Sequence, residues 1–317
     1  MTPSLDSQSS ASPIWFTEHG IPVRNLWHML LYAWDELPLT SQWVMKDIEK
    51  APTLDALLAT ALLQLMQGRL RIGLGRAYVH GRETVRGIRG RIDFDESRKR
   101  RMFERGEAAC EFDQYSANEP RNQITRSMLT RLVQTGQFGP EADSANELRS
   151  RLRHLTRDLD GIDLIDITPE LIHRQQAIHN DRDYRLMLAI CDFILQRQMP
   201  SGPALQAEAA VPEIDRESLV LHNVYERFVA NFYRIHLRGW DVTPQKRLEW
   251  HSKETNPHLP LMIPDLVLQE KSSRRLIILD TKFTARSLVE NRWGRPILDS
   301  AHMYQLYAYL RSQEHVS

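Results

Sequence analysis

Two aspartates and a lysine near the C-terminal end have the residue types and spacing of a metal-dependent hydrolytic site. Asp265 follows Pro264 inside the apolar run 261–268, and Asp280 and Lys282 lie near the end of a second apolar run, 276–283. The segment between the runs is charged or small, which is typical of the turn of a β-hairpin. We therefore predict two antiparallel strands that carry these three side chains.

The length of the turn decides which residues face each other. A two-residue turn at Ser272 and Ser273 places Asp265 directly opposite Asp280. Like charges in that position destabilise a sheet, so the pair needs a compensating cation, which a divalent metal would supply. A three-residue turn would move Asp265 off this face.

Lys282 belongs to the same predicted site. Side chains two apart on a strand share a face, so Lys282 projects beside Asp280. Hard cations such as Mg²⁺ take carboxylate oxygens, lower the pKa of a bound water and neutralise a scissile phosphate. The alternative is an exposed ion pair at a strand end.

The residues before Asp280 favour the site over the ion pair. Residues 277–279 are Ile-Ile-Leu, which predicts a strand buried on both faces. An unpaired charge at the end of such a strand is costly. The acid at this place therefore needs a compensating partner.

Two flanking helices contribute further polar residues. Gln305 and Tyr309 lie four apart in the helix predicted at 299–311, so they share one face. Glu226 lies in the helix predicted at 217–237. A strand predicted at 241–250 follows that helix.

This order of elements resembles the core of the PD-(D/E)xK nucleases. A helix with Glu226 comes first, then a strand, the strand with Pro264-Asp265, the strand with Asp280-Thr-Lys282 and the helix with Gln305. Gln305 and Tyr309 match the Q-x-x-x-Y motif of the RecB-like branch.

The resemblance implies a role for each residue. Asp265, Asp280 and Glu226 would be metal ligands. Lys282 would be the catalytic lysine, and Gln305 and Tyr309 would hold DNA or the site itself. The implied cofactor is Mg²⁺.

Two N-terminal segments narrow the family. Residues 22–34 (PVRNLWHMLLYAW) and 89–94 (RGRIDF) are similar to segments of McrC proteins. The resemblance implies the nuclease subunit of the McrBC modification-dependent restriction system. Its implied partners are a McrB-like AAA+ GTPase hexamer, on which the N-terminal domain docks, and double-stranded DNA that carries modified cytosine.

The chain has no G-x-x-x-x-G-K-[ST] loop to cradle nucleotide phosphates. GTP is therefore expected on the partner and not on this chain. Basic residues crowd residues 82–105, and Arg86, Arg89 and Arg91 are candidate contacts to the partner or to DNA. The simpler interpretation of these charges is a solvated face.

Composition is that of an ordinary globular protein. Of the 317 residues, 42% are hydrophobic and 26% charged, with a formal net charge of zero, which argues against a surface coated with positive charge. Two distant cysteines form neither a disulfide framework nor a zinc cluster. With no secretory signal and no apolar run long enough for a membrane span, a cytoplasmic location is expected and no membrane partner.

The pattern predicts two domains and a tail. Residues 1–13 read as a disordered tail and residues 14–200 as a partner-docking domain of helices and a small β module. Residues 201–317 read as the nuclease domain, and the boundary falls at the Pro-Ser-Gly-Pro cluster 200–203. The predicted helices of the docking domain are 24–37, 52–68, 118–133, 148–159 and 183–198, and its β pieces are 77–80, 87–94 and 109–115.

The predicted fold class is α+β, with a PD-(D/E)xK α/β core after the docking domain. Such cores continue past the Gln-bearing helix into another strand, and the sequence stops eight residues beyond Tyr309. We therefore expect either that the core lacks its last strand or that the chain is a truncated version. The alternatives to an active subunit are a non-catalytic subunit that assembles with the GTPase and stimulates it, and a stand-alone RecB-like nuclease.

Overall fold

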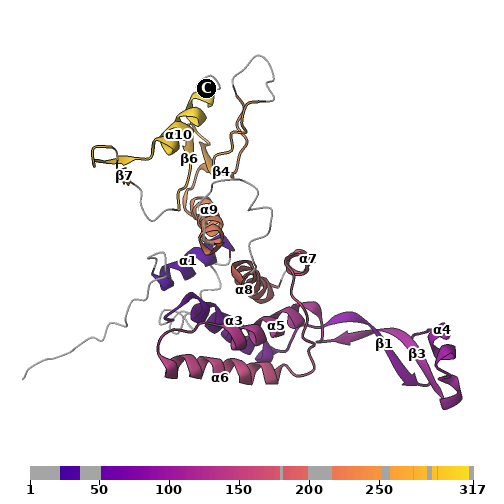
Figure 1. The fold of residues 1–317 in the computed structure, drawn as a ribbon. Coiled ribbons are helices and arrows are strands. Elements are labelled where there is room, and N and C mark those ends of the chain that lie inside the picture. The colour runs from indigo at the N-terminus through magenta and orange to yellow at the C-terminus, as the bar shows by residue number, and fades with distance from the viewer. Residues whose placement is uncertain are drawn as a thin grey trace, which may run out of the picture. The chain divides into compact units, whose positions relative to one another are not determined.

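The computed structural model describes residues 22–35, 51–178, 181–198, 216–250, 258–273, 275–283, 288–290 and 292–313 (Figure 1). The chain forms two compact units. One consists of residues 51–198, and the other combines residues 1–50 with residues 199–317. The expected tail 1–13 and the junction 200–203 lie outside the described residues.

The N-terminal helix belongs to the C-terminal unit. Helix α1 (Val23–Ala33) packs on α9 (Arg216–His236). The Tyr32 ring lies 5.7 Å from the Phe232 ring, and the Asn231 amide donates a hydrogen bond of 2.8 Å to the Tyr32 carbonyl at the end of α1. This differs from the expected docking domain of residues 14–200, because an apolar helical face does not reveal which domain it covers.

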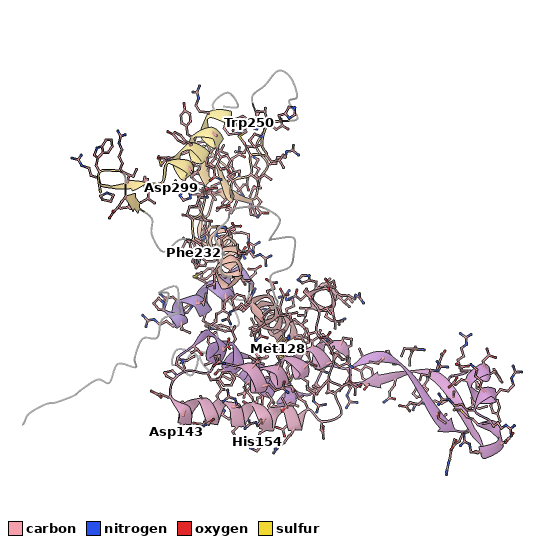
Figure 2. All side chains as sticks on the ribbon, in the orientation of Figure 1. Met128, Asp143, His154, Phe232, Trp250 and Asp299 are labelled. Atoms are coloured by element: carbon pink, nitrogen blue, oxygen red, sulfur yellow. The ribbon has the colours of Figure 1, made fainter. Side chains whose placement is uncertain are left out.

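Residues 51–198 form a helical body with one β module. Its helices are α3 (Leu54–Ile72), α5 (Pro120–Thr135), α6 (Ala142–Asp158), α7 (Pro169–Ile178) and α8 (Arg182–Gln198). Their apolar faces meet in a core that includes Leu57, Leu62 and Met128, all fully buried; Figure 2 labels Met128 on α5. Burial of these side chains is the main favourable contribution to this unit.

One helix of this body is longer than predicted. The second helix does not end at Gly68 but continues to Ile72, and it ends at Gly73, whose φ of 103° favours glycine. Helix α7, for which the sequence analysis made no prediction, packs on α8 with Ile172 buried.

The β module is a long antiparallel hairpin with short additions. It contains β1 (Ala77–Arg86), β2 (Arg91–Ile92), α4 (Phe94–Lys99), a 3₁₀ turn η2 (Phe103–Arg105) and β3 (Glu107–Ser116). The strand order is β1-β3-β2, and Figure 1 shows β1 and β3 running together away from α5. The predicted strand 87–94 pairs only at 91–92, because Asp93 caps α4 by accepting a hydrogen bond from the Glu96 amide.

A buried polar cluster fixes the root of this hairpin. The Tyr184 hydroxyl donates to the Asn122 side chain at 2.6 Å and accepts from the Gly75 amide at 2.8 Å. The Asn122 amide donates to the Gly75 carbonyl and to the Ala117 carbonyl, so residues at both ends of the hairpin meet on α5 and α8. Every one of these polar groups is paired, as burial demands.

The C-terminal unit contains a three-stranded antiparallel sheet. Its strands are β4 (Trp240–Pro244), β5 (Leu266–Glu270) and β6 (Leu276–Leu279), in the order β4-β5-β6. Helix α9 contacts β4, and α10 (Ser300–Gln313) contacts β6. The predicted strand 241–250 is shorter than expected, because the chain turns at Gln245 with a φ of 47°.

The core of this sheet joins α10 to the strands. It consists of Leu248, Met262, Val267, Ile278 and Tyr309, all buried. Asp299, labelled in Figure 2, begins α10 by accepting a hydrogen bond from the Ala301 amide at 2.8 Å.

The C-terminal unit also contains a short hairpin that was not expected from the sequence. Strand β7 (Leu288–Glu290) pairs with β8 (Pro296–Leu298). Together the helices and sheets agree with the predicted α+β class. Within the described part of the chain, no helix is long and apolar enough to cross a membrane.

Candidate active site

The pairing of β5 with β6 brings the two aspartates together. Leu266 pairs with Leu279, so one step outward along both strands Asp265 lies opposite Asp280. The Glu270 amide donates to the Arg275 carbonyl at 2.8 Å at the other end of the ladder. This is the register of the two-residue turn, and that prediction is confirmed.

Asp280 is buried beside a cation. Its side chain is 8% exposed, and its Oδ2 lies 2.6 Å from the Lys282 Nζ. Strand β6 ends at Leu279, so the alternation of a regular strand does not place Lys282. The chain after the strand nevertheless returns the lysine to the carboxylate.

Gln305 links these two residues to α10. Its Oε1 accepts a hydrogen bond of 3.2 Å from the Lys282 Nζ, and its Nε2 donates to Asp280 Oδ1 at 3.3 Å. The same amide donates to the Tyr309 hydroxyl at 2.9 Å, which confirms that Gln305 and Tyr309 share one face. The Tyr309 hydroxyl in turn donates to the Ile263 carbonyl at 3.3 Å, two residues before Asp265.

Asp265 is held by a residue that the sequence did not single out. Its Oδ2 accepts hydrogen bonds from the Thr281 amide and, at 2.7 Å, from the Thr281 hydroxyl. Thr281 lies between Asp280 and Lys282, where strand alternation would turn it to the opposite face. The end of β6 removes that restriction, so sequence periodicity could not reveal this contact.

The negative charge of Asp265 acts on the Glu226 carboxyl. Burial raises the pKa of the Glu226 carboxyl above its ordinary value, and the negative charge of Asp265 raises it further. His222, one helical turn earlier, approaches Glu226 Oε1 to 2.8 Å and opposes this rise. The site therefore holds excess negative charge on its α9 side.

Gln245 is a second residue that the sequence analysis missed. Its side chain hydrogen-bonds to Glu226, and its backbone amide donates to the Asp265 carbonyl at 3.0 Å. Its φ of 47° is in the left-handed region, which residues other than Gly, Asn and Asp rarely adopt. A glutamine among polar residues gives no sequence signal for this role.

The carboxylate oxygens of this site are of the kind that binds a hard cation. Their positions in the structure do not form a complete coordination shell. Asp265, Asp280 and Glu226 offer carboxylate oxygens, the ligands that Mg²⁺ prefers. Within the described ranges, no three His, Cys, Asp or Glu side chains are close enough to hold an ion as they stand. The Lys282 ammonium supplies the compensating charge on Asp280.

The three candidate arginines lie in the other unit, on the β module. Arg86 ends β1 opposite Glu107, Arg91 pairs with Glu111 in the ladder, and the Arg89 guanidinium lies 4.0 Å from the centre of the Phe112 ring.

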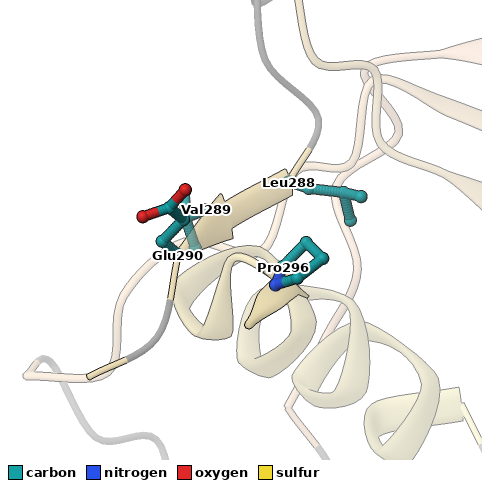
Figure 3. Close-up of a pocket in the computed structure, with 4 residues that line it drawn as sticks. All are labelled: Leu288, Val289, Glu290 and Pro296. Carbon is teal, nitrogen blue, oxygen red and sulfur yellow. The ribbon is translucent and has the colours of Figure 1, made fainter. Parts of the chain in front are cut away.

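A hollow on the β7–β8 hairpin is lined by none of the three carboxylates Asp265, Asp280 and Glu226. It has a volume of about 590 Å³ and is lined by Leu288, Val289, Glu290 and Pro296 (Figure 3). With one acid and three apolar side chains, it lacks the groups of a hydrolytic site.

The fold has a counterpart among solved structures. The chain resembles a chain of the refined half-complex from the tetradecameric assembly of Thermococcus gammatolerans McrB AAA+ hexamers with bound McrC. The TM-score is 0.52 at 17% identity, over 92% of this chain. The match spans 61% of that chain's length.

Residues 8–317 match the family described as McrBC 5-methylcytosine restriction system component, and the chain belongs to that family. It is 28% identical over 299 residues to the type IV methyl-directed restriction enzyme EcoKMcrBC of Escherichia coli (strain K12). That alignment covers 92% of this chain and 81% of the relative.

Proposed function

We propose that the chain is the Mg²⁺-dependent DNA endonuclease subunit of a McrBC-like, GTP-driven restriction complex that cuts methylcytosine-containing DNA. One observation carries the proposal. Lys282 lies between Asp280 and Gln305, with Gln305 bonded to Tyr309, so residues from β6 and α10 converge in one hydrogen-bonded group. An exposed ion pair needs no such arrangement.

Each residue has a chemical role in this proposal, built on a PD-(D/E)xK core. Asp265, Asp280 and Glu226 would hold Mg²⁺, which supplies charge neutralisation at the scissile phosphate and an activated water when bound. The Lys282 ammonium would donate a hydrogen bond to the attacking water or to the developing negative charge. Gln305 and Tyr309 orient Lys282 and Asp280.

The proposed partner is a McrB-like AAA+ GTPase hexamer. The structurally similar assembly is of McrB AAA+ hexamers with bound McrC, and this sequence has no phosphate-binding loop of its own. GTP would therefore be bound and hydrolysed by the partner, and this chain would stimulate that hydrolysis.

The β module is the proposed contact with the motor or with DNA. It extends from the helical body and carries Arg86, Arg89 and Arg91, all exposed. Substituting Arg86 and Arg91 by Glu is expected to abolish co-purification with the motor and stimulation of GTP hydrolysis. Unchanged association and GTP turnover would assign these charges to a solvated face.

A reconstitution tests the nuclease proposal. The chain is combined with the motor encoded beside it, and cleavage of methylated and unmethylated duplex is followed with GTP and Mg²⁺. Cleavage is expected only with methylated duplex and all components. Cleavage without motor or GTP would favour a stand-alone RecB-like nuclease.

A second candidate function has one observation in its favour. Both oxygens of Asp280 already have partners, Lys282 and Gln305, an arrangement that would also suit a non-catalytic subunit that assembles with the GTPase and stimulates it. Stimulated GTP hydrolysis without cleavage at any Mg²⁺ concentration would support that role.

A further inference from the structure

The β7–β8 hairpin is short and has no buried strand residue. It pairs at three positions, from Leu288 with Leu298 to Glu290 with Pro296. All six strand residues are exposed, including Leu288 at 47% and Leu298 at 56%. A lone two-stranded hairpin is marginally stable in water, so a bound partner would stabilise this one.

The tip of the hairpin carries an aromatic ring between two cations. The loop reads Arg292-Trp293-Gly294-Arg295. Trp293 is 68% exposed, and the Arg292 guanidinium lies 3.9 Å from the centre of its ring. Gly294 has a φ of 68°, which makes the tight turn possible.

In sequence, the hairpin lies between two residues of the proposed active site. It begins after Lys282 and ends before Gln305, and these two side chains are in contact. Eleven residue steps separate Lys282 from Trp293, a path of at most about 40 Å when fully extended. Since duplex DNA rises about 3.4 Å per base pair, the tip reaches no more than about 12 base pairs from the phosphate held at Lys282.

We propose that the β7–β8 hairpin is a DNA-binding element whose Trp293 stacks on a base of the duplex while Arg292 and Arg295 contact the flanking phosphates. This rests on the proposed nuclease function and adds a binding site to it. Apolar side chains inserted between base steps are a common means of gripping duplex DNA, and stacking on an aromatic ring tolerates any sequence.

Charge favours DNA over a protein partner. Residues 288–298 contain two arginines and one acid, Glu290, so the hairpin carries a net positive charge that complements a polyanion. Stacking of Arg292 on the indole presents a cation and a flat ring on one surface, which suits a nucleotide. A protein that bound here would need an acidic groove of matching shape, and this is an outcome that the experiment separates.

The test measures binding without cleavage. The full chain is titrated in EDTA onto a methylated duplex of about 30 base pairs, longer than the reach of the hairpin. Anisotropy gives the affinity, and 2-aminopurine within the duplex reports unstacking. Trp293→Ala is expected to weaken binding about ten-fold, or roughly 1.4 kcal/mol, and to abolish the 2-aminopurine signal.

Three further variants sharpen this result. Trp293→Phe keeps an aromatic ring and is expected to restore most of the affinity. Arg292→Gln and Arg295→Gln should each lower the slope of log affinity against log salt by about one. Tyr307→Ala, which removes a 62%-exposed ring from α10, is the matched control and should bind as the wild type does.

Two outcomes would overturn the proposal. Trp293→Ala that binds duplex normally but loses the motor would make the hairpin a protein-docking element, and a variant unchanged in both would remove any role in binding. Failure of the nuclease proposal is a separate result. It would appear as cleavage that survives Asp280→Ala, whatever the hairpin variants do in EDTA.

Discussion

Lys282 compensates a carboxylate that has little access to water. Asp280 is 8% exposed, and the Lys282 ammonium lies 2.6 Å from it. Substituting Lys282 by Ala removes a transition-state cation without removing a metal ligand, so the cleavage rate should fall about 100- to 1,000-fold. The half-saturating Mg²⁺ concentration should not rise.

The matched control is Lys271→Ala. Lys271 lies 3.2 Å from Asp241 in an ion pair whose members are 60% and 65% exposed, so it has the same chemistry outside the site. Both rates are measured as initial cleavage of methylated duplex. Equal rates for the two variants would show that Lys282 is an ordinary surface partner.

Gln245 is predicted to position the metal ligands without binding metal. Substituting Gln245 by Gly relieves the φ of 47° but removes the amide that holds Glu226. The variant should unfold at the wild-type temperature, yet need about 10- to 100-fold more Mg²⁺ for half-maximal cleavage, as is typical of residues that orient ligands. Wild-type Mg²⁺ dependence would restrict Gln245 to the backbone turn.

The raised pKa of Glu226 predicts that the stability of the fold depends on pH. Its pKa is raised by burial and by Asp265, so the folded chain keeps a proton that the unfolded chain has already released. Stability from this group is therefore greatest at low pH and declines as pH rises from about 4.5 through the raised pKa. Glu226→Gln should remove that decline.

The measurement is the difference in thermal midpoint between wild type and Glu226→Gln without metal, between roughly pH 4 and pH 8. The variant should gain on the wild type as pH rises. Midpoints that run parallel over this range would mean that neither burial nor Asp265 raises the pKa of Glu226 in the fold.

Among the elements, strands were easier to pair than to delimit. The β5–β6 register followed from the two-residue turn at Ser272 and Ser273, because one face of each strand is buried and a slip would expose it. The predicted strand ends differ from the observed ones by several residues. The chain leaves the sheet at Gln245, where φ is 47°, and at Asp280, whose carboxylate contacts Lys282 and Gln305. Hairpin β7–β8 had no predictive pattern because none of its residues is buried.

The root of the long β1–β3 hairpin depends on Tyr184. Substituting Tyr184 by Phe leaves the Asn122 oxygen and the Gly75 amide without their buried partner. The free energy of unfolding should fall by about 1–3 kcal/mol. Urea denaturation of Tyr184→Phe is compared with that of Tyr115→Phe, whose ring is 57% exposed; equal losses would contradict a buried network at the root.

For the whole molecule, the sequence did not reveal which unit α1 joins. The break near residue 200 coincides with one division of the chain, whereas α1 packs with α9 in the C-terminal unit. Helical periodicity shows that α1 has an apolar face, but not that Tyr32 and Phe232 will meet. The β5–β6 register was easier to predict, because it depends on two adjacent strands and the short turn between them.

Asp280→Asn provides the most direct test that the carboxylate site cuts DNA. The substitution keeps the size of the side chain and its hydrogen bond with Gln305 but removes the charge that would hold Mg²⁺. In the complex reconstituted with motor, GTP and Mg²⁺, cleavage of methylated duplex should fall by more than the roughly 10- to 100-fold typical of residues that only support ligands, while GTP hydrolysis continues. Cleavage at the wild-type rate would contradict the proposed active site.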